Sequence, residues 1–332
     1  MKKTIYRGIE NLEVTECPIP DCPEDGIVVR NLCAAICGSD VFSYYHGAEF
    51  EGVFPGDEFG HEMISEVVKI GHNISDVKIG DRLYPFPLFA RGDTSRAGSV
   101  GGYSEYFEMP HFKLGMSAFK IDDSISNIEG SLVEPLTVGH HAAKVTHPTK
   151  ESHAVVFGAG MIGCACAIAL KYMGVEKVMI TDISPKRLEI ASHMGVEVCN
   201  VASEDYLTKA KDYFGEEMGM VDADLYIEAS GVKSNLDLFM NSAKRLSTLC
   251  ITSVFHEPVA LDLMKLNFSA FTIIGSPAYD IEDVLAVLEM LKSHQFPIKD
   301  LVTHTYRIDD INEAFEKAAD SKDSLKVVID YQ

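Results

Sequence analysis

The stretch from Ala154 to Ser184 constrains the fold more than any other part of the chain, because it has the pattern of a complete strand, helix and strand unit. The apolar run Ala154 to Phe157 is typical of a buried parallel strand. A G-x-G-x-x-G turn follows and opens a helix that ends at Gly174. A second strand, Lys177 to Thr181, closes the unit, which is therefore typical of a doubly wound fold.

Each glycine of this turn has a separate physical task. Gly158 permits the tight turn, Gly160 lets the backbone approach a pyrophosphate, and Gly163 lets the helix lie close to the strand. The helix N-terminus adds free N–H groups and the positive end of a dipole. The sequence therefore predicts a dinucleotide site over Gly158, Ala159, Gly160, Met161, Ile162 and Gly163.

Asp182 stands at the end of the second strand, about twenty residues after the turn. A carboxylate there accepts hydrogen bonds from ribose hydroxyls and repels a 2′-phosphate, which predicts NAD rather than NADP. Lys186 and Arg187 follow closely enough to weaken this preference, and we count Arg187 among the cofactor-binding residues. Alternatively, both belong to the solvated first turn of a helix capped by Ser184.

Composition excludes several classes of partner. A chain of 332 residues that is 46% hydrophobic is long enough for two domains with separate cores. The formal net charge of −21 argues against nucleic acid and anionic membranes as partners. We expect neither a signal peptide nor a membrane span, because the first sixteen residues lack an apolar core and glycines interrupt the most apolar stretch. Eight cysteines without a dense framework indicate reduced thiols and a cytoplasmic location.

Two patterns divide the chain. In the first part, up to about residue 136, short strands alternate with glycine and proline, which is typical of a closed or partly closed β-barrel. From Thr137 onward, strands alternate with helices, which predicts a parallel sheet with helices on both faces. The chain ends in an apolar strand, Leu325 to Ile329.

Chemically reactive side chains gather in the first part. Cys37-Gly38-Ser39-Asp40 and Gly60-His61-Glu62 place a thiol, an imidazole and a carboxylate at loop-to-strand junctions, and Glu134 adds a second carboxylate. These are zinc ligands, and three protein ligands leave a position for water or substrate, as a catalytic site requires. Taken singly, each has a structural alternative: a core thiol, a hydrogen-bonded histidine, a surface charge and a helix-start acid.

Together with the glycine turn, these motifs resemble the zinc-dependent medium-chain dehydrogenase/reductase family, most closely its sorbitol and polyol dehydrogenase branch. The matching motifs are C-G-S-D at Cys37, G-H-E at Gly60, E-P-L-T-V-G at Glu134, and Glu228-Ala229-Ser230-Gly231. The resemblance implies an α/β protein in which a GroES-like β-barrel catalytic domain is joined to a Rossmann doubly wound parallel-sheet domain. The predicted catalytic domain covers residues 1–138, completed by 276–332, and the predicted NAD-binding domain covers residues 139–275.

The resemblance also implies residue roles. One catalytic zinc is bound by Cys37, His61 and Glu62, with Glu134 as a fourth ligand or as a hydrogen-bond partner of the zinc water. Ser39 is the first proton acceptor, and the implied cofactor-binding residues outside the glycine turn are Thr137 and Val138, beside the nicotinamide, and Ser230 and Gly231. The expected reaction is hydride transfer between a secondary alcohol of a polyol or alditol phosphate and NAD.

The chain departs from the family in three places. The lobe that normally carries four cysteines for a structural zinc, here Pro85 to Gly102, contains none, so a single metal is predicted. Phe42 occupies the position of a proton-relay histidine, which leaves the path beyond Ser39 open. Ala278 stands where sorbitol dehydrogenases tend to have arginine, which leaves the identity of the polyol open.

Arg91 and Arg96 form a candidate phosphate site within the segment that replaces the cysteine lobe, together with the hydroxyls of Thr94 and Ser95. Arginines bind phosphate bidentately, and a chain of net charge −21 needs a local positive site to accept an anion. The alternative is a solvated loop in which one arginine pairs with Asp93. A neutral polyol is therefore the main expectation and an alditol phosphate its variant.

Two other functions would keep the same nucleotide turn, namely a zinc-free NAD(P)H reductase and a non-catalytic dinucleotide-binding protein. The set of Cys37, His61 and Glu62 argues against both. The apolar strand Phe271 to Gly275 comes late in the sheet and is predicted to be an edge. Pairing of this edge across a two-fold axis predicts a homodimer or homotetramer.

Overall fold

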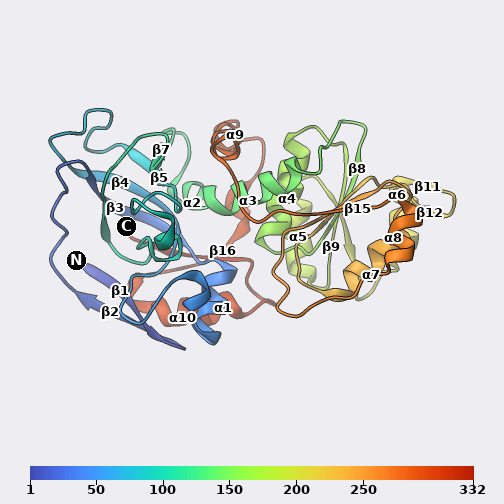
Figure 1. Cartoon of the computed structure of the whole chain (residues 1–332), viewed down its shortest axis with the longest axis horizontal. Helices are drawn as coiled ribbons and strands as arrows, with labels where there is room; N and C mark the ends of the chain where they lie inside the picture. Colours follow the sequence, from blue (N-terminus) through green and yellow to red (C-terminus); the bar gives the residue numbers. More distant parts are fainter. The chain divides into compact units, whose positions relative to one another are not determined.

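Two sheets organise the structure, a mostly antiparallel seven-stranded sheet and a parallel six-stranded sheet (Figure 1). The computed structural model describes every residue from Met1 to Gln332, and the chain divides into two compact units. The barrel unit consists of Met1–Glu134, Leu291–His294 and Ile298–Gln332. The parallel-sheet unit consists of Pro135–Met290 and Gln295–Pro297.

Strand β3 (Ile27–Ala35) is the centre of the barrel unit, because all but one of its residues are buried. It pairs antiparallel with β4 (Glu62–Ile70), β6 (Tyr106–Met109) and β17 (Lys326–Asp330). The other strands of this unit are β1 (Lys2–Gly8), β2 (Asn11–Glu16), β5 (Arg82–Pro85), β7 (Ala118–Lys120) and β16 (Val302–Tyr306). Since β17 is the last strand of the chain, the C-terminal segment completes a sheet that the N-terminal segment begins.

Short helices lie between these strands, although the sequence shows no long helical period there. Helix α1 (Gly38–His46) begins after Cys37, whose N–H donates to the Asp40 carboxylate at 3.2 Å, and it ends at Gly47, with φ of 103°. The other helices of the unit are α2 (Asn127–Ser131), α10 (Ile311–Ala319) and the 3-10 turns η1 (Glu49–Glu51), η2 (Thr94–Ser99), η3 (Ile298–Leu301) and η4 (Ile308–Asp310). Helix α1 places its first turn directly after the metal-ligand candidate Cys37.

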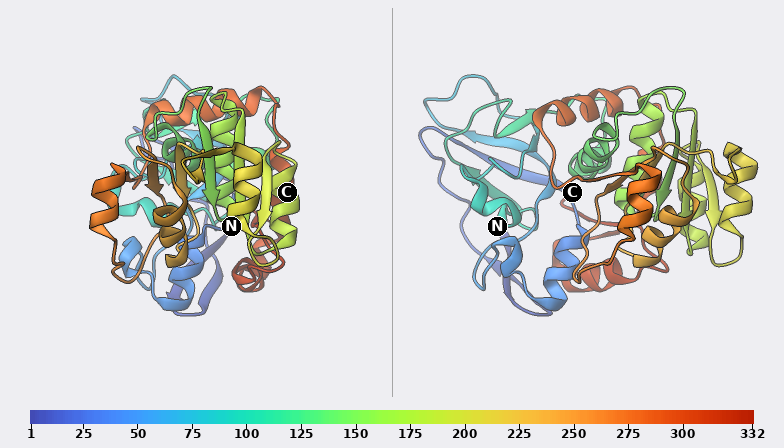
Figure 2. Two further views of the ribbon diagram at one scale, coloured as in Figure 1. Left: turned by 90° about the vertical axis from the view of Figure 1, so that its right-hand side faces the viewer. Right: turned by 45° about the vertical axis from the view of Figure 1, so that its right-hand side comes forward.

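The parallel-sheet unit has the predicted doubly wound arrangement, with helices on both faces of its sheet (Figure 2). In spatial order its strands are β10 (Glu197–Asn200), β9 (Lys177–Asp182), β8 (His153–Phe157), β13 (Leu225–Glu228), β14 (Thr248–Ile251) and β15 (Thr272–Gly275). The order reverses between β8 and β13, and ligands of such sheets bind beyond the carboxyl ends of the strands at this point. The sequence pattern of alternating strands and helices is therefore confirmed.

The helices of this unit follow their strands closely in the sequence. They are α3 (Val133–Lys144), which starts in the barrel unit, α4 (Met161–Tyr172), α5 (Pro185–Ser192), α6 (Tyr206–Phe214), α7 (Lys233–Ser242), α8 (Leu263–Ser269) and α9 (Ile281–Lys292), with a small β11 (Glu216–Glu217) and β12 (Met220–Val221) hairpin. Helix α8 was not expected from the sequence, because three of its four apolar residues are exposed and only Leu266 packs against the core.

Arg91 has a structural partner, so its predicted role in binding a phosphate is wrong. Its side chain is 2% exposed and pairs with Glu58, while Nη1 lies 2.8 Å from Glu108 Oε1. The guanidinium also lies over the Phe107 ring, 5.6 Å from its centroid. A buried ion pair thus anchors the segment that stands in place of the cysteine lobe.

We expect Arg91→Met to lower the free energy of unfolding by about 3–5 kcal/mol, because it leaves Glu58 buried without its main cation. Denaturant-induced unfolding measures this loss. Arg96→Met, in the same segment but half-buried, is the matched control and should cost less than about 1 kcal/mol. Equal losses for the two variants would contradict an anchoring role for Arg91.

Candidate metal and nucleotide sites

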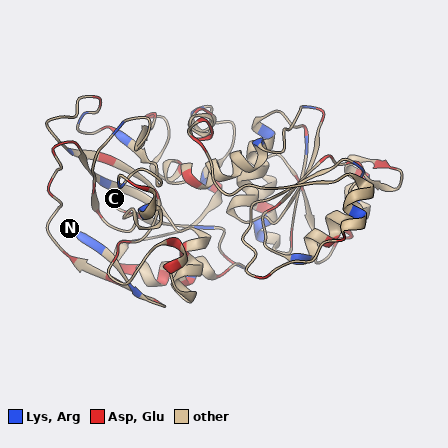
Figure 3. Cartoon of the chain, in the orientation of Figure 1, with Lys and Arg blue, Asp and Glu red and all other residues tan.

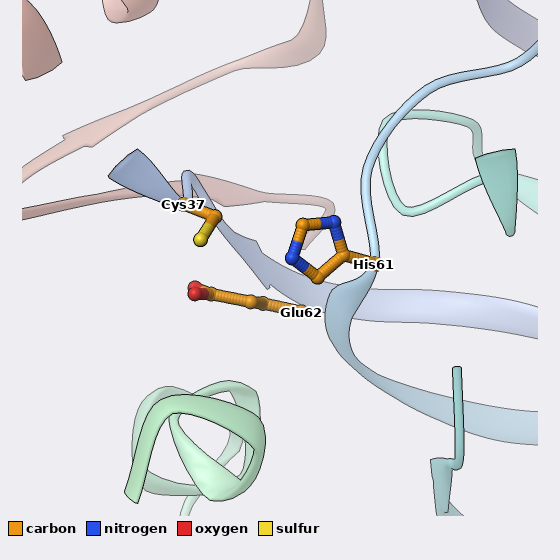
Figure 4. Close-up of side chains that lie close together, drawn as sticks. All are labelled: Cys37, His61 and Glu62. Atoms are coloured by element: carbon orange, nitrogen blue, oxygen red, sulfur yellow. The ribbon is translucent and has the colours of Figure 1, made fainter. Parts of the chain in front are cut away.

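The side chains of Cys37, His61 and Glu62 point toward one another in the barrel unit (Figure 4). One ligand atom from each lies within 4.8 Å of the others. The cause is the register of the sheet, in which Ala35 of β3 pairs with Glu62, the first residue of β4. Cys37 follows β3 by two residues and His61 precedes β4 by one, so the three predicted ligands are brought together.

Asp40 holds the imidazole of His61 in place. Its carboxylate is fully buried, accepts a hydrogen bond from the Tyr103 hydroxyl at 2.5 Å, and lies 3.3 Å from Nδ1 of His61. Burial alone lowers the pKa of His61, but the charge and hydrogen bond of Asp40 and the contact with Cys37 raise this pKa well above its usual value. With Nδ1 directed at a carboxylate, Nε2 is the nitrogen left for a metal.

Lys326 was not recognised from the sequence as a site residue. It starts β17, is 3% exposed, and places Nζ 2.5 Å from Oε2 of Glu62 and 2.8 Å from the carbonyl oxygen of Ile36. Burial lowers its pKa, whereas the charges of Glu62 and Cys37 raise it, and the net shift is upward. A lysine within the otherwise apolar run Leu325 to Ile329 was the only sequence signal for this buried cation.

The residues present fit a divalent cation. Oε2 of Glu62 is ion-paired with Lys326, but its buried Oε1 accepts no hydrogen bond, whereas buried polar atoms nearly always have a partner. Thiolate, imidazole and carboxylate are the ligands that zinc takes in proteins. Burial and the charge of Glu62 raise the pKa of the Cys37 thiol, and a cation between these groups would favour its thiolate instead.

Ser39 and Glu134 lie in the same unit but are not part of this group of three. The Ser39 hydroxyl, in the first turn of α1, donates to Cys37 Sγ at 3.2 Å. Glu134 is 8% exposed in the first turn of α3, and its charge contributes to the raised pKa of Lys326. Whether Glu134 binds a metal directly or through water stays a prediction.

The glycine turn has the geometry that its sequence predicts. Gly158 has φ of 100°, a left-handed value that favours glycine, and a Cβ on Gly163 would lie 1.8 Å from the Gly158 carbonyl oxygen. A Cβ on Gly160 would meet only Arg187 Nη1, at 4.0 Å, which leaves open space at the N-terminus of α4. The turn therefore needs glycine at 158 and 163 for its own packing and offers room at 160.

Two carboxylates hold the loops around this turn. Asp182, at the end of β9, accepts from the N–H of Ala159 at 2.8 Å and from the N–H of Ser184 at 2.8 Å. Glu228, at the end of β13, is fully buried and accepts from the N–H groups of Ser230 and Gly231 at 3.1 and 3.0 Å. Glu228 was seen in the sequence only as part of a motif, because its partners follow it on a loop whose path the sequence does not show.

The remaining predicted cofactor residues lie on elements of the parallel-sheet unit. Thr137 is buried and Val138 half-buried on α3, and Ser230 and Gly231 follow β13. Their contact with a nicotinamide or ribose stays a prediction.

Two family models and several known proteins match the chain. Residues 161–293 match the family model described as zinc-binding dehydrogenase, and residues 23–118 match the alcohol dehydrogenase GroES-like domain. The chain is similar to an L-threonine 3-dehydrogenase of Alteromonas mediterranea, with 27% identity over 95% of each chain. It is also similar to a sorbitol dehydrogenase of Bombyx mori, with 25% identity over 99% of this chain and 98% of that protein.

The fold is likewise similar to that of 2R,3R-butanediol dehydrogenase from Bacillus subtilis. The TM-score is 0.87 at 24% identity, covering 100% of this chain and 99% of the other. None of the helices is both long and apolar enough to cross a bilayer.

We expect Gly160→Ala to weaken dinucleotide binding by about tenfold or more without changing the melting temperature, because the added methyl group enters the space left for a ligand. Gly163→Ala is the contrasting variant and should lower the melting temperature, since its Cβ would overlap the Gly158 carbonyl oxygen. Thermal unfolding and a fluorescence titration with NADH measure the two effects. Unchanged NADH affinity in Gly160→Ala would show that the turn does not approach a pyrophosphate.

Proposed function

The chain belongs to the zinc-type medium-chain dehydrogenase family, and we propose that it transfers a hydride between a secondary alcohol of a polyol and NAD. The convergence of Cys37, His61 and Glu62 carries this proposal, because it supplies three zinc ligands, among them a buried Glu62 oxygen, Oε1, that accepts no hydrogen bond. An alditol phosphate loses its main support, since Arg91 is buried in an ion pair.

The proposed site holds one zinc ion, because residues 85–102 contain no cysteine for a second. Cys37, His61 and Glu62 hold it, with Glu134 as a fourth ligand or as a partner of the zinc water. Bound zinc polarises the alcohol oxygen and lowers its pKa. Asp40 keeps the His61 ring oriented, and Ser39 accepts the alcohol proton first.

The proposed cofactor is NAD, with its pyrophosphate on the turn before α4. Asp182 accepts ribose hydroxyl groups, and Arg187, whose guanidinium lies near Gly160, contributes a positive charge. The remaining proposed contacts are Thr137 and Val138 at the nicotinamide and Ser230 and Gly231 beyond β13.

Two rival functions share the nucleotide turn, namely a zinc-free reductase and a non-catalytic dinucleotide-binding protein. Neither needs a thiol, an imidazole and a carboxylate within 4.8 Å, or a buried carboxylate oxygen that accepts no hydrogen bond. Acidic side chains occur along both units (Figure 3), and the net charge of −21 supports a small-molecule substrate rather than nucleic acid or a membrane. Eight free cysteines, five of them buried, support a location in the reducing cytoplasm.

We also propose a homo-oligomer, a dimer or a tetramer, built through β15. This strand ends the six-stranded sheet and is at most half-buried, as the sequence suggested for this edge. Helix α8, which precedes it, exposes Leu263, Met264 and Phe268 by 69%, 69% and 74%. An open edge beside exposed apolar side chains is a surface that a second copy would cover.

The function is tested by following NADH absorbance with polyols, alditol phosphates and short secondary alcohols in parallel. We expect a neutral polyol to be oxidised, with NAD bound at least about tenfold more tightly than NADP, because Asp182 repels the 2′-phosphate. Elemental analysis of the same sample should find one zinc ion per chain. Two tightly bound zinc ions, equal efficiency with both cofactors, or no turnover of any alcohol would each contradict the corresponding part of the proposal.

Cys37→Ser is the matched variant for this test. It should lose the zinc and the turnover, because a hydroxyl is a poor zinc ligand, while NADH binding to the parallel-sheet unit persists. Full turnover after loss of the metal would favour the zinc-free reductase, and NADH binding without turnover in the zinc-loaded wild type would favour the non-catalytic protein.

We expect sedimentation velocity at micromolar concentration to show a dimer or a tetramer. The N–H groups of Thr272 and Ser276 donate to Ser247 and Ile251, so by alternation the N–H of Ile273 points away from β14. Ile273→Pro should therefore block pairing at the edge and yield a monomer that still binds NADH. A monomeric wild-type protein would contradict the proposal.

A further inference from the structure

A line of polar side chains leads away from Cys37 in the barrel unit. Ser39 donates to Cys37 Sγ at 3.2 Å and acts on the carboxyl group of Glu51, whose pKa it lowers. Ser43, one helical turn further along α1, donates to Glu51 Oε2 at 2.6 Å. Glu51, the last residue of η1, therefore accepts from Ser43 and lies beside Ser39, which is four residues earlier on the same face of α1, and neither serine is one of the proposed metal ligands.

The surroundings of Glu51 favour its protonated form. Burial raises the pKa of Glu51, as does the charge of Asp40, and these effects outweigh the charge of His61 and the hydrogen bonds from Ser39 and Ser43. Segment η2 packs against the Glu51 main chain, since a Cβ on Gly98 would lie 2.9 Å from the Glu51 carbonyl oxygen.

The charged groups of η2 are not among those that shift the pKa of Glu51. Its cation, Arg96, acts on Asp93 and lowers the pKa of that carboxyl, after the larger effect of the Ser95 hydrogen bonds. Glu51 itself is half-buried, so its carboxyl group remains in reach of water.

Phe42 does not offer an alternative route. Its ring lies 4.5 Å from the ring of His46 and 5.4 Å from that of Phe50, measured between centroids. A phenyl ring neither donates nor accepts a proton, so a proton that reaches Ser39 needs another acceptor.

We propose that Glu51 accepts the proton that Ser39 releases when the alcohol is oxidised. This inference rests on the proposed dehydrogenase function. The alcohol O–H proton passes to Ser39 Oγ while the hydroxyl proton of Ser39 passes to the Glu51 carboxylate. The carbinol hydride reduces NAD⁺ to NADH, the substrate becomes a carbonyl compound, and the carboxylic acid of Glu51 then releases its proton to water.

The direction of the pH dependence follows from this role. Oxidation needs an ionised Glu51, so its rate rises as pH rises through the pKa of this carboxyl. Reduction of the carbonyl product needs a protonated Glu51, so that rate falls over the same pH range. A glutamine at this position accepts the Ser43 hydrogen bond through its amide oxygen but takes up no proton.

The test compares Glu51→Gln, Glu51→Asp and Glu49→Gln with the wild type. Glu49 lies in the same η1 turn but is exposed, so its variant is the matched control. We expect Glu51→Gln to lower kcat for oxidation at pH 7 about a hundredfold and to lose the rise with pH, while zinc content and NADH affinity stay unchanged. Glu51→Asp should keep the pH dependence at reduced kcat, and Glu49→Gln should match the wild type.

Other outcomes overturn the proposal. A wild-type pH profile in Glu51→Gln would exclude Glu51 as the acceptor, and a raised KM with unchanged kcat would make it a substrate-binding group. A loss of kcat that accompanies loss of zinc, or that leaves the pH profile unchanged, would assign Glu51 a structural role. Absence of alcohol oxidation in the wild type would instead refute the dehydrogenase function, and this inference with it.

Discussion

The convergence of Cys37, His61 and Glu62 depends on how β3 pairs with β4 and β17. Ala35 pairs with Glu62 on one side and with Val328 on the other, so the chain that continues to Cys37 lies beside Glu62 and close to Lys326. Because side chains alternate along a strand, a slip of one residue would turn Glu62 away from Cys37. The side chains of β3 oppose such a slip, since it would turn Arg30, the one exposed residue of this strand, toward the buried side.

The register also concentrates charge where water is scarce. Asp40, Glu62 and Lys326 are 0%, 1% and 3% exposed, and buried charges are costly unless they are paired. Oδ2 of Asp40 accepts from Tyr103 and Cys37, and Oε2 of Glu62 pairs with Lys326, but Oδ1 of Asp40 and Oε1 of Glu62 accept no hydrogen bond. A cation bound by Glu62 would satisfy Oε1, and would then stabilise the folded barrel unit.

Buried or half-buried carboxylates are also important in the parallel-sheet unit, where they hold loops in place through hydrogen bonds. Asp182 and Glu228 stand at the carboxyl ends of β9 and β13, and each accepts backbone N–H groups from nearby loops. Loops held in this way need not reorganise when a ligand arrives, which reduces the entropic cost of binding. Glu228 lies next to the switch point of the sheet, where Gly158 approaches Ser230 so closely that a Cβ would be 2.9 Å from it.

The sequence by itself determined the local features, because their causes lie within a few consecutive residues. The glycine turn, its strand and helix, and the motifs around Cys37 and His61 are of this kind. Short helices such as α1 and α8 escaped prediction, since nine or seven residues carry too little periodicity. Only the tertiary structure decided which partner each charged group meets: Arg91 meets Glu58, Lys326 meets Glu62, and Glu51 meets Ser43. Burial and pairing set the behaviour of such groups, and their partners come from segments whose proximity the order of residues does not reveal.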